Sequence, residues 1–105
     1  MGYFQYRGQT NNMEKMDINE VIQLVEQNEL AKSLEILNEH IRANSNDTQA
    51  LQLRGRINYK LQKWGDAMND FSSVLELDAN NPEAKSGLQM ARNILGYFTP
   101  DMFNP

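Results

Sequence analysis

The chain has 105 residues, of which 40% are hydrophobic and 23% charged, so it fits one globular domain and wholesale disorder is excluded. A formal net charge of -4 argues against nucleic acid or an acidic membrane as the main partner, because phosphate binding needs clustered Lys and Arg. With no cysteine, disulfides, thiolate metal sites and cysteine nucleophiles are excluded, and packing alone must hold the fold.

Residues 1–12 are polar and aromatic, and they lack the basic start and apolar run of a secretory signal. No stretch of the sequence approaches the apolar length of a membrane span. We therefore expect a flexible leader at 1–12 and a cytoplasmic protein. The leader either belongs to the native chain or precedes a start at Met13.

Residues 13–95 show helical periodicity throughout. The first predicted helix is apolar over a broad face that includes Ile18 and Ile22, and Asp17 with Glu20 three residues later resembles a capping box. The second predicted helix has apolar side chains at three- and four-residue steps from Leu30 onward. They are Leu30, Leu34, Leu37 and Ile41.

Three further helices are predicted along the chain. Asp47 can cap the third helix, whose apolar pattern is less regular. The fourth has the clearest amphipathic pattern, and the fifth starts with Asn81 as N-cap and Pro82 at the first helical position. The loops between helices are short, so successive helices must run antiparallel. The fourth helix carries its apolar face on Trp64, Ala67, Met68, Phe71, Val74 and Leu75.

The sequence repeats itself with a period of about 34 residues. The shift aligns the apolar faces of two helices, and it also aligns the loop signal at Asp47 with that at Asn81. Agreement of helix faces and loops in one register indicates a real repeat. The aligned pairs are Leu30 with Trp64, Ser33 with Ala67, Leu34 with Met68, Leu37 with Phe71, and Ile41 with Leu75.

The second copy resembles one complete tetratricopeptide repeat (TPR). The resemblance is carried by Ala50, Leu51, Arg54, Gly55, Leu61, Trp64, Ala67, Asp70, Phe71, Leu75, Leu77, Asp78 and Asn80. Gly55 and Ala67 are small where two helices of a hairpin cross closely, and Trp64 and Phe71 are large where the next helix leaves room.

The sequence also departs from the TPR pattern. Asn58 stands where the family usually has an aromatic residue, and Ala79 where it usually has Pro. The first copy has Ser33 and His40 at positions usually held by small apolar residues, and the third copy consists of its first helix only. The resemblance therefore implies about two and a half repeats.

The resemblance implies an all-α fold, a right-handed α-α superhelix (a TPR-like solenoid) of about five antiparallel helices. In similar proteins the first helices of the hairpins line a concave groove that holds a peptide segment. The implied function is a non-catalytic adaptor or scaffold for protein–protein interaction. By the repeat register, the peptide-binding groove should be lined by Gln52, Arg56, Tyr59, Lys60, Met90 and Asn93.

Arg56 and Lys60 lie four residues apart, so they share a helix face and give an acidic protein a small positive spot beside Tyr59. We therefore predict a protein or peptide partner that is acidic or carboxylate-bearing. The bland interpretation is that the two cations are ordinary solvated charges.

Similar proteins that grip the acidic carboxy-terminal tails of chaperones do so with basic and Asn side chains. The matching positions here hold Ile18, Ile22, Glu83 and Gly87, so binding of a chaperone tail is not expected.

No catalytic, cofactor or metal site is predicted. His40 is the only histidine and has no ligands or base partners in a recognisable spacing, so we interpret it as a half-buried helix residue. The carboxylates are spread along amphipathic helices, which a solvated polar face explains. We expect no enzyme and no cofactor.

The tail, residues 96–105, is aromatic and too rich in Pro to extend the last helix beyond Thr99. We expect it to pack on the last helix of its own chain, and the alternative is that it docks on a neighbour. The alternative function is accordingly a structural subunit that self-associates through its apolar terminal helix and tail. The expected state is a monomer or a weak homodimer.

Overall fold

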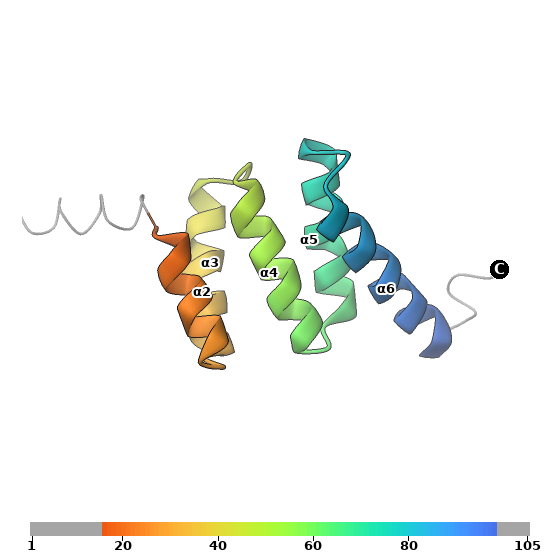
Figure 1. Ribbon diagram of the computed structural model, residues 1–105, viewed down its shortest axis with the longest axis horizontal. Helices are drawn as coiled ribbons and strands as arrows, with labels where there is room; N and C mark the ends of the chain where they lie inside the picture. The colour runs from red at the N-terminus through yellow and green to blue at the C-terminus, as the bar shows by residue number, and fades with distance from the viewer. Residues whose placement is uncertain (1–15, 99–105) are drawn as a thin grey trace, which may run out of the picture. The chain divides into compact units, whose positions relative to one another are not determined.

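The structure is a computed structural model, and it describes residues 16–98. In this range the chain forms five α-helices and no β-strand. Their bounds are α2 (Ile18–Glu26), α3 (Leu30–Ala43), α4 (Thr48–Lys60), α5 (Trp64–Leu77) and α6 (Pro82–Phe98) (Figure 1). Two compact units result, with α2 and α3 in the first and α4, α5 and α6 in the second.

The predicted domain boundaries are only partly covered by these residues. The leader at 1–12 and the tail beyond residue 98 lie outside the described residues. Gly96, where we placed the start of the tail, is still helical, because α6 continues to Phe98. The packing of the tail stays a prediction.

Three of the five helices, α2, α4 and α6, start at a capping residue of the sequence, whereas α3 and α5 have no side-chain cap. Asp47 Oδ1 accepts a hydrogen bond from the Ala50 amide at 3.2 Å, and Asn81 Oδ1 accepts one from the Ala84 amide at 2.9 Å. Asp17 caps α2 through the amide two residues later, at 3.0 Å. Each cap satisfies an amide that the first turn of a helix leaves without an intrahelical partner.

The repeat is visible in the backbone as well as in the side chains. Asn28, between α2 and α3, has φ 65°, and Gln62, one period later between α4 and α5, has φ 63°. These are the only non-glycine residues with positive φ in the described range. Positive φ is uncommon for residues with a Cβ. Both hairpins therefore turn in the same way at the same place.

The first unit packs α2 against α3 around Val21 and Leu37, which are 2% and 0% exposed. Ser33 is fully buried, and its Oγ donates to the Glu29 carbonyl at 2.8 Å. His40 is 8% exposed, so it is buried more deeply than the half-buried position that we predicted. The two polar departures from the TPR pattern thus lie in the interior of the chain.

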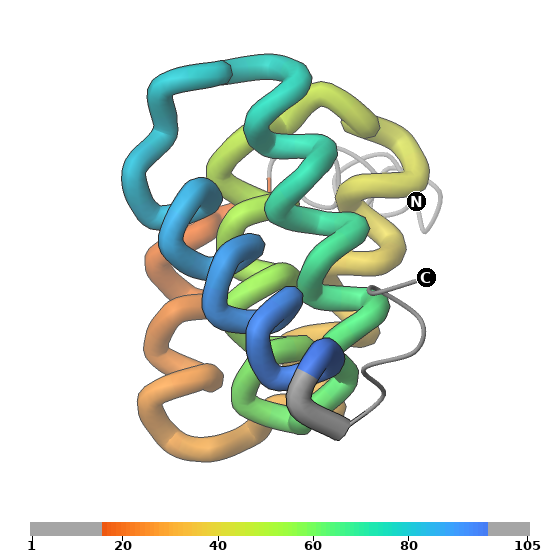
Figure 2. The backbone as a smooth tube through the Cα atoms, turned by 90° about the vertical axis from the view of Figure 1, so that its right-hand side faces the viewer, coloured from red at the N-terminus to blue at the C-terminus, as the bar shows by residue number. Residues whose placement is uncertain are grey.

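In the second unit, α6 lies against both α4 and α5 (Figure 2). Most of the buried side chains of this unit are apolar. Its fully buried side chains are Ala50, Ile57, Ala67, Val74, Ala84 and Ala91. Alanines at the helix contacts let the backbones approach closely. Large side chains such as Phe71 fill the space between the helices away from these contacts.

A polar network joins α4 to α5 inside this unit. Asp70 is 4% exposed and accepts hydrogen bonds from Arg54 Nε at 3.1 and 3.0 Å and from Arg54 Nη2 at 2.8 Å. Asn58 Nδ2 donates to the same carboxylate at 3.0 Å. The amide at position 58, unusual for a TPR, therefore serves as a third donor to a buried charge.

Candidate functional site

The candidate site is built on Phe71, which reaches from α5 to the contact between α4 and α6. A Cβ placed on Gly55 of α4 would lie 2.8 Å from the Phe71 ring, and one placed on Gly87 of α6 would lie 2.5 Å from it. Real Cβ atoms do not approach a ring so closely. The backbones at Gly55 and Gly87 thus approach the Phe71 ring so closely that neither position has room for a side chain.

Above this ring lies a pocket of about 290 Å³, which we call the α4–α6 pocket. Its apolar part combines Phe71 with Tyr59 and Met90, and Met90 is 49% exposed. An exposed Met beside a ring is an adaptable apolar contact for a ligand. The complete lining is Arg56, Tyr59, Lys60, Phe71, Glu83, Ser86, Gly87 and Met90.

Tyr59 is held in place by Trp64 at the start of α5. The two ring centroids lie 5.0 Å apart with an interplanar angle of 77°, an edge-to-face arrangement. Such pairs stabilise by about 0.5–1.5 kcal/mol beyond the area they bury. Trp64 therefore supports the Tyr59 ring, while Met90, the other apolar lining residue beside Phe71, is half exposed.

The charges at this site are more balanced than the sequence suggested. Glu83 on α6 accepts from Arg56 Nε and Arg56 Nη2, both at 2.9 Å, in a bidentate pair. Gln52 Nε2 also donates to Glu83, and Gln52 Oε1 accepts from Asn81 Nδ2 at 2.8 Å. We predicted a positive spot at Arg56 and Lys60, but an acidic partner inside the chain already neutralises Arg56.

The bidentate hydrogen bonds of Arg56 lower the pKa of Glu83 below its ordinary value of 4.5, helped by Gln52 and opposed by partial burial. A lowered folded-state pKa adds stability above about pH 4.5, and this is lost as the pH falls through the folded-state value.

In wild type, the free energy of unfolding should fall below pH 4.5 as Glu83 is protonated. In Glu83→Gln this fall should be smaller, by less than about 1 kcal/mol, because solvent screens the Arg56–Glu83 pair. Chemical unfolding from pH 7 to pH 3 measures it. Glu76→Gln, at an exposed position of α5, is the control. Parallel pH curves for wild type and Glu83→Gln would contradict the assignment.

Four of the six predicted groove residues line the α4–α6 pocket, namely Arg56, Tyr59, Lys60 and Met90. Gln52 instead lies in the network with Glu83. The side-chain Oδ1 of Asn93 accepts from Gln89 at 2.9 Å on the exposed surface.

Phe71, Glu83 and Gly87 also line the pocket, but they were not among the predicted groove residues. We had taken Phe71 for pure core, although it is also the floor of the pocket. Glu83 was identified only as a mismatch to a chaperone clamp. An Arg and a Glu at facing positions of neighbouring first helices are the sequence signal that could have predicted the pair.

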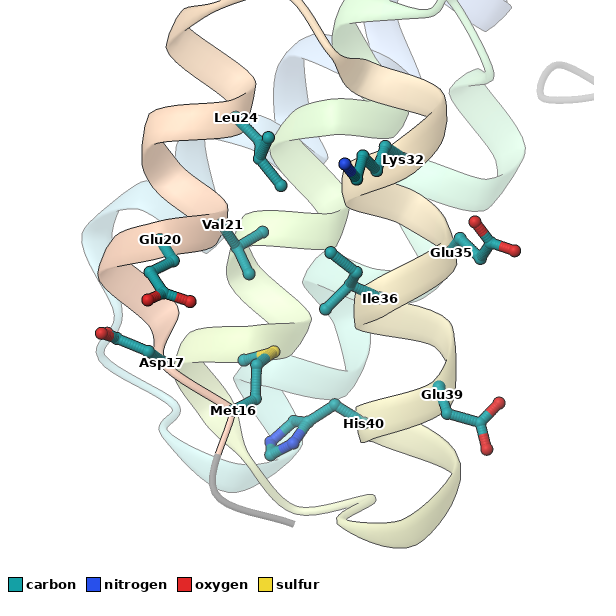
Figure 3. A pocket seen from close by; sticks show the side chains of 10 residues that line it. All are labelled: Met16, Asp17, Glu20, Val21, Leu24, Lys32, Glu35, Ile36, Glu39 and His40. Carbon is teal, nitrogen blue, oxygen red and sulfur yellow. The ribbon is translucent and has the colours of Figure 1, made fainter. Parts of the chain in front are cut away.

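A second pocket, of about 510 Å³, lies in the first unit between α2 and α3 (Figure 3). We call it the α2–α3 pocket. Val21, Leu24 and Ile36 point into it from the two helices, and His40 and Met16 lie at one end. No residue of this pocket was among the predicted groove residues.

Within residues 16–98 no group of three or more His, Cys, Asp or Glu side chains is placed to hold a metal ion. None of the helices in this range has both the length and the apolar character that crossing a bilayer requires.

Known structures provide the comparison. The chain is similar to a solved structure described as the first TPR of Spaghetti (RPAP3) bound to the HSP90 peptide SRMEEVD, with a TM-score of 0.71 and 29% sequence identity. The match covers 74% of this chain and 62% of that one, so the chain spans less than two thirds of its length. No protein-family model matches the chain, and no curated protein matches it significantly. The predicted fold class, an all-α TPR-like helical repeat, is confirmed.

Proposed function

We propose that this TPR-like protein is a non-catalytic interaction module that binds a peptide segment in the α4–α6 pocket. The observation that carries the proposal is a pocket with an apolar floor and an exposed Met, between two first helices of a helical repeat. The similar TPR structure, which holds a peptide, supports the same class of ligand. Concave sites that combine apolar walls with a few polar groups are typical of ligand binding.

The side chain that the pocket accepts is apolar. Phe71 and Tyr59 supply ring surface, and Met90 can change its rotamer to fit different shapes. We propose that an apolar residue of the partner inserts here and that an acidic group next to it meets Lys60. Lys60 is exposed and makes no ion pair within residues 16–98.

The partner differs from an acidic chaperone tail in how it is held. Glu83 places a carboxylate where such a tail requires a cation, and Arg56 is already committed to Glu83. Gly87 has no room for a long basic side chain, because even a Cβ would meet Phe71 at 2.5 Å. We therefore expect the peptide SRMEEVD to bind this chain no better than a scrambled peptide of equal composition.

The proposal is tested in two steps. A photo-crosslinking amino acid at Met90, in the native host, should capture a peptide segment that the same amino acid at exposed Lys85 does not. The captured segment is then synthesised and its dissociation constant measured by calorimetry. Lys60→Glu should weaken binding about tenfold through charge reversal, which is about 1.4 kcal/mol.

Lys85→Glu is the matched control, because it makes the same charge change on α6 away from the pocket. Tyr59→Ala should weaken binding at least as much as Lys60→Glu, since it removes a wall of the pocket. Equal affinities for Lys60→Glu and Lys85→Glu would contradict the proposal that the peptide binds in the α4–α6 pocket. A molar mass that rises with concentration in light scattering, with no captured peptide, would favour the alternative of self-association.

A further inference from the structure

The α2–α3 pocket has a different character from the α4–α6 pocket and is separate from the proposed function. An apolar strip of Val21, Leu24 and Ile36 runs between the two helices (Figure 3). Leu24 and Ile36 are only partly covered. At about 510 Å³ it is also the larger of the two pockets.

Two residues on this face are less buried than their equivalents in the second copy of the repeat. One period later, the positions equivalent to Leu24 and Ile36 are Asn58 and Asp70, and both are buried in the second unit, at 6% and 4% exposure. In stacked helical repeats a helix of a neighbouring repeat packs on the face of each hairpin. The α2–α3 pocket therefore lies at positions of the repeat on which a further helix can pack.

Carboxylates border both edges of the apolar strip. Asp17 and Glu20 stand on α2, and Glu35 and Glu39 stand on the outer side of α3 (Figure 3). Lys32 is the one Lys or Arg side chain in this lining, which also includes His40.

Most of that negative charge has no ion-pair partner among residues 16–98. Glu39 is paired with Arg42 at 2.6 Å, but Glu20 and Glu35 make no ion pair within residues 16–98. Like charges gathered around an apolar strip select for an opposite charge on the ligand.

We propose that the α2–α3 pocket binds a basic amphipathic helix of a partner protein. Its apolar side chains lie on Val21, Leu24 and Ile36, and its Lys and Arg side chains reach Glu20 on one edge and Glu35 on the other. A helix laid in a groove contacts it through side chains three and four residues apart. A seat as long as the nine residues of α2 spans about two and a half helical turns.

A second copy of this chain is a poorer occupant. Two acidic pockets facing each other would repel, and the chain as a whole carries a formal net charge of -4. The carboxylates beside the apolar strip thus favour a basic helix over a second copy of this chain.

The test uses the full chain and a designed probe. The probe is a fluorescein-labelled helical peptide of about 14 residues, four turns, with Leu on one face and Lys on the other. The control peptide has Glu in place of Lys. Fluorescence anisotropy measures affinity, and amide chemical shifts in NMR spectra locate the contact.

We expect the Lys peptide to bind and to change the amide chemical shifts of Leu24 and Ile36. Its affinity should fall as the salt concentration is raised. The Glu peptide should not bind. The double variant Glu20→Gln/Glu35→Gln should weaken binding about five- to tenfold, as expected for two exposed ion pairs. Asp66→Asn/Glu76→Gln removes the same charge from α5 and should change the affinity less than twofold.

Three results would overturn the proposal. Equal losses in the two double variants would mean that only net charge attracts the peptide. Shifts confined to α4 and α6 would place the peptide in the other pocket. A gain in affinity from Phe4→Ser/Tyr6→Ser would mean that residues 1–12 of the chain itself already occupy the α2–α3 pocket.

Discussion

Replacing Asp70 by alanine should lower the free energy of unfolding by about 3 kcal/mol, the largest effect that we expect of any single substitution in this chain. The reason is that Asp70 is 4% exposed and accepts all its hydrogen bonds from Arg54 and Asn58. Without the carboxylate, a guanidinium with 23% side-chain exposure and a buried amide both lose their hydrogen bonds to Asp70.

The midpoint of thermal unfolding should fall by roughly 10–20 °C in a chain of this size. Circular dichroism measures the midpoint, and urea titration gives the free energy. The control is Arg42→Ala, which breaks an exposed ion pair with Glu39 whose side chains are 70% and 57% exposed. That control should cost less than about 0.5 kcal/mol. An Asp70→Ala protein as stable as Arg42→Ala would show that the network contributes nothing to stability.

Replacing Gly87 by alanine should destabilise the protein by about 1–2 kcal/mol, although alanine is the better helix former. A methyl group at this position would lie 2.5 Å from the ring of Phe71, which Gly55 confines on the other side. Overpacking a core costs about 1–3 kcal/mol, and the gain in helix propensity, about 1 kcal/mol, offsets only part of it.

The chain contains a matched control for this substitution. Gly65 is also helical, but a Cβ there meets nothing within 4 Å. Gly65→Ala should therefore stabilise the protein by a few tenths to about 1 kcal/mol, and Gly55→Ala should destabilise it as Gly87→Ala does. Urea unfolding of the three variants measures whether each substitution raises or lowers the free energy of unfolding. A stabilising Gly87→Ala would show that the ring moves freely and that the glycines do not shape the α4–α6 pocket.

Local chemistry in the sequence was sufficient to place the helices. Asp47 and Asn81 mark helix starts because their side chains bond to amides only three residues away. The turns at Asn28 and Gln62 lie one period of the repeat apart, so the repeat found in the sequence also sets their spacing. Features that depend on neighbours within one turn of helix can be predicted from a single sequence.

Four residues of the α4–α6 pocket were also predicted, because their register on two equivalent helices sets the face they share. The prediction of a positive spot failed at Arg56, whose carboxylate partner Glu83 belongs to another helix. Periodicity assigns a residue to a face of its own helix, but it does not say which side chain of the next helix lies opposite.

The sequence by itself therefore determined the helices, their caps, the repeat and the choice of helix faces. Only the tertiary structure decided that Asn58 completes the shell around Asp70, that Glu83 engages Arg56, and that Gly87 makes room for Phe71. The physical reason is that caps and turns are set by backbone groups within a few residues, whereas these three contacts depend on the distance between packed helices.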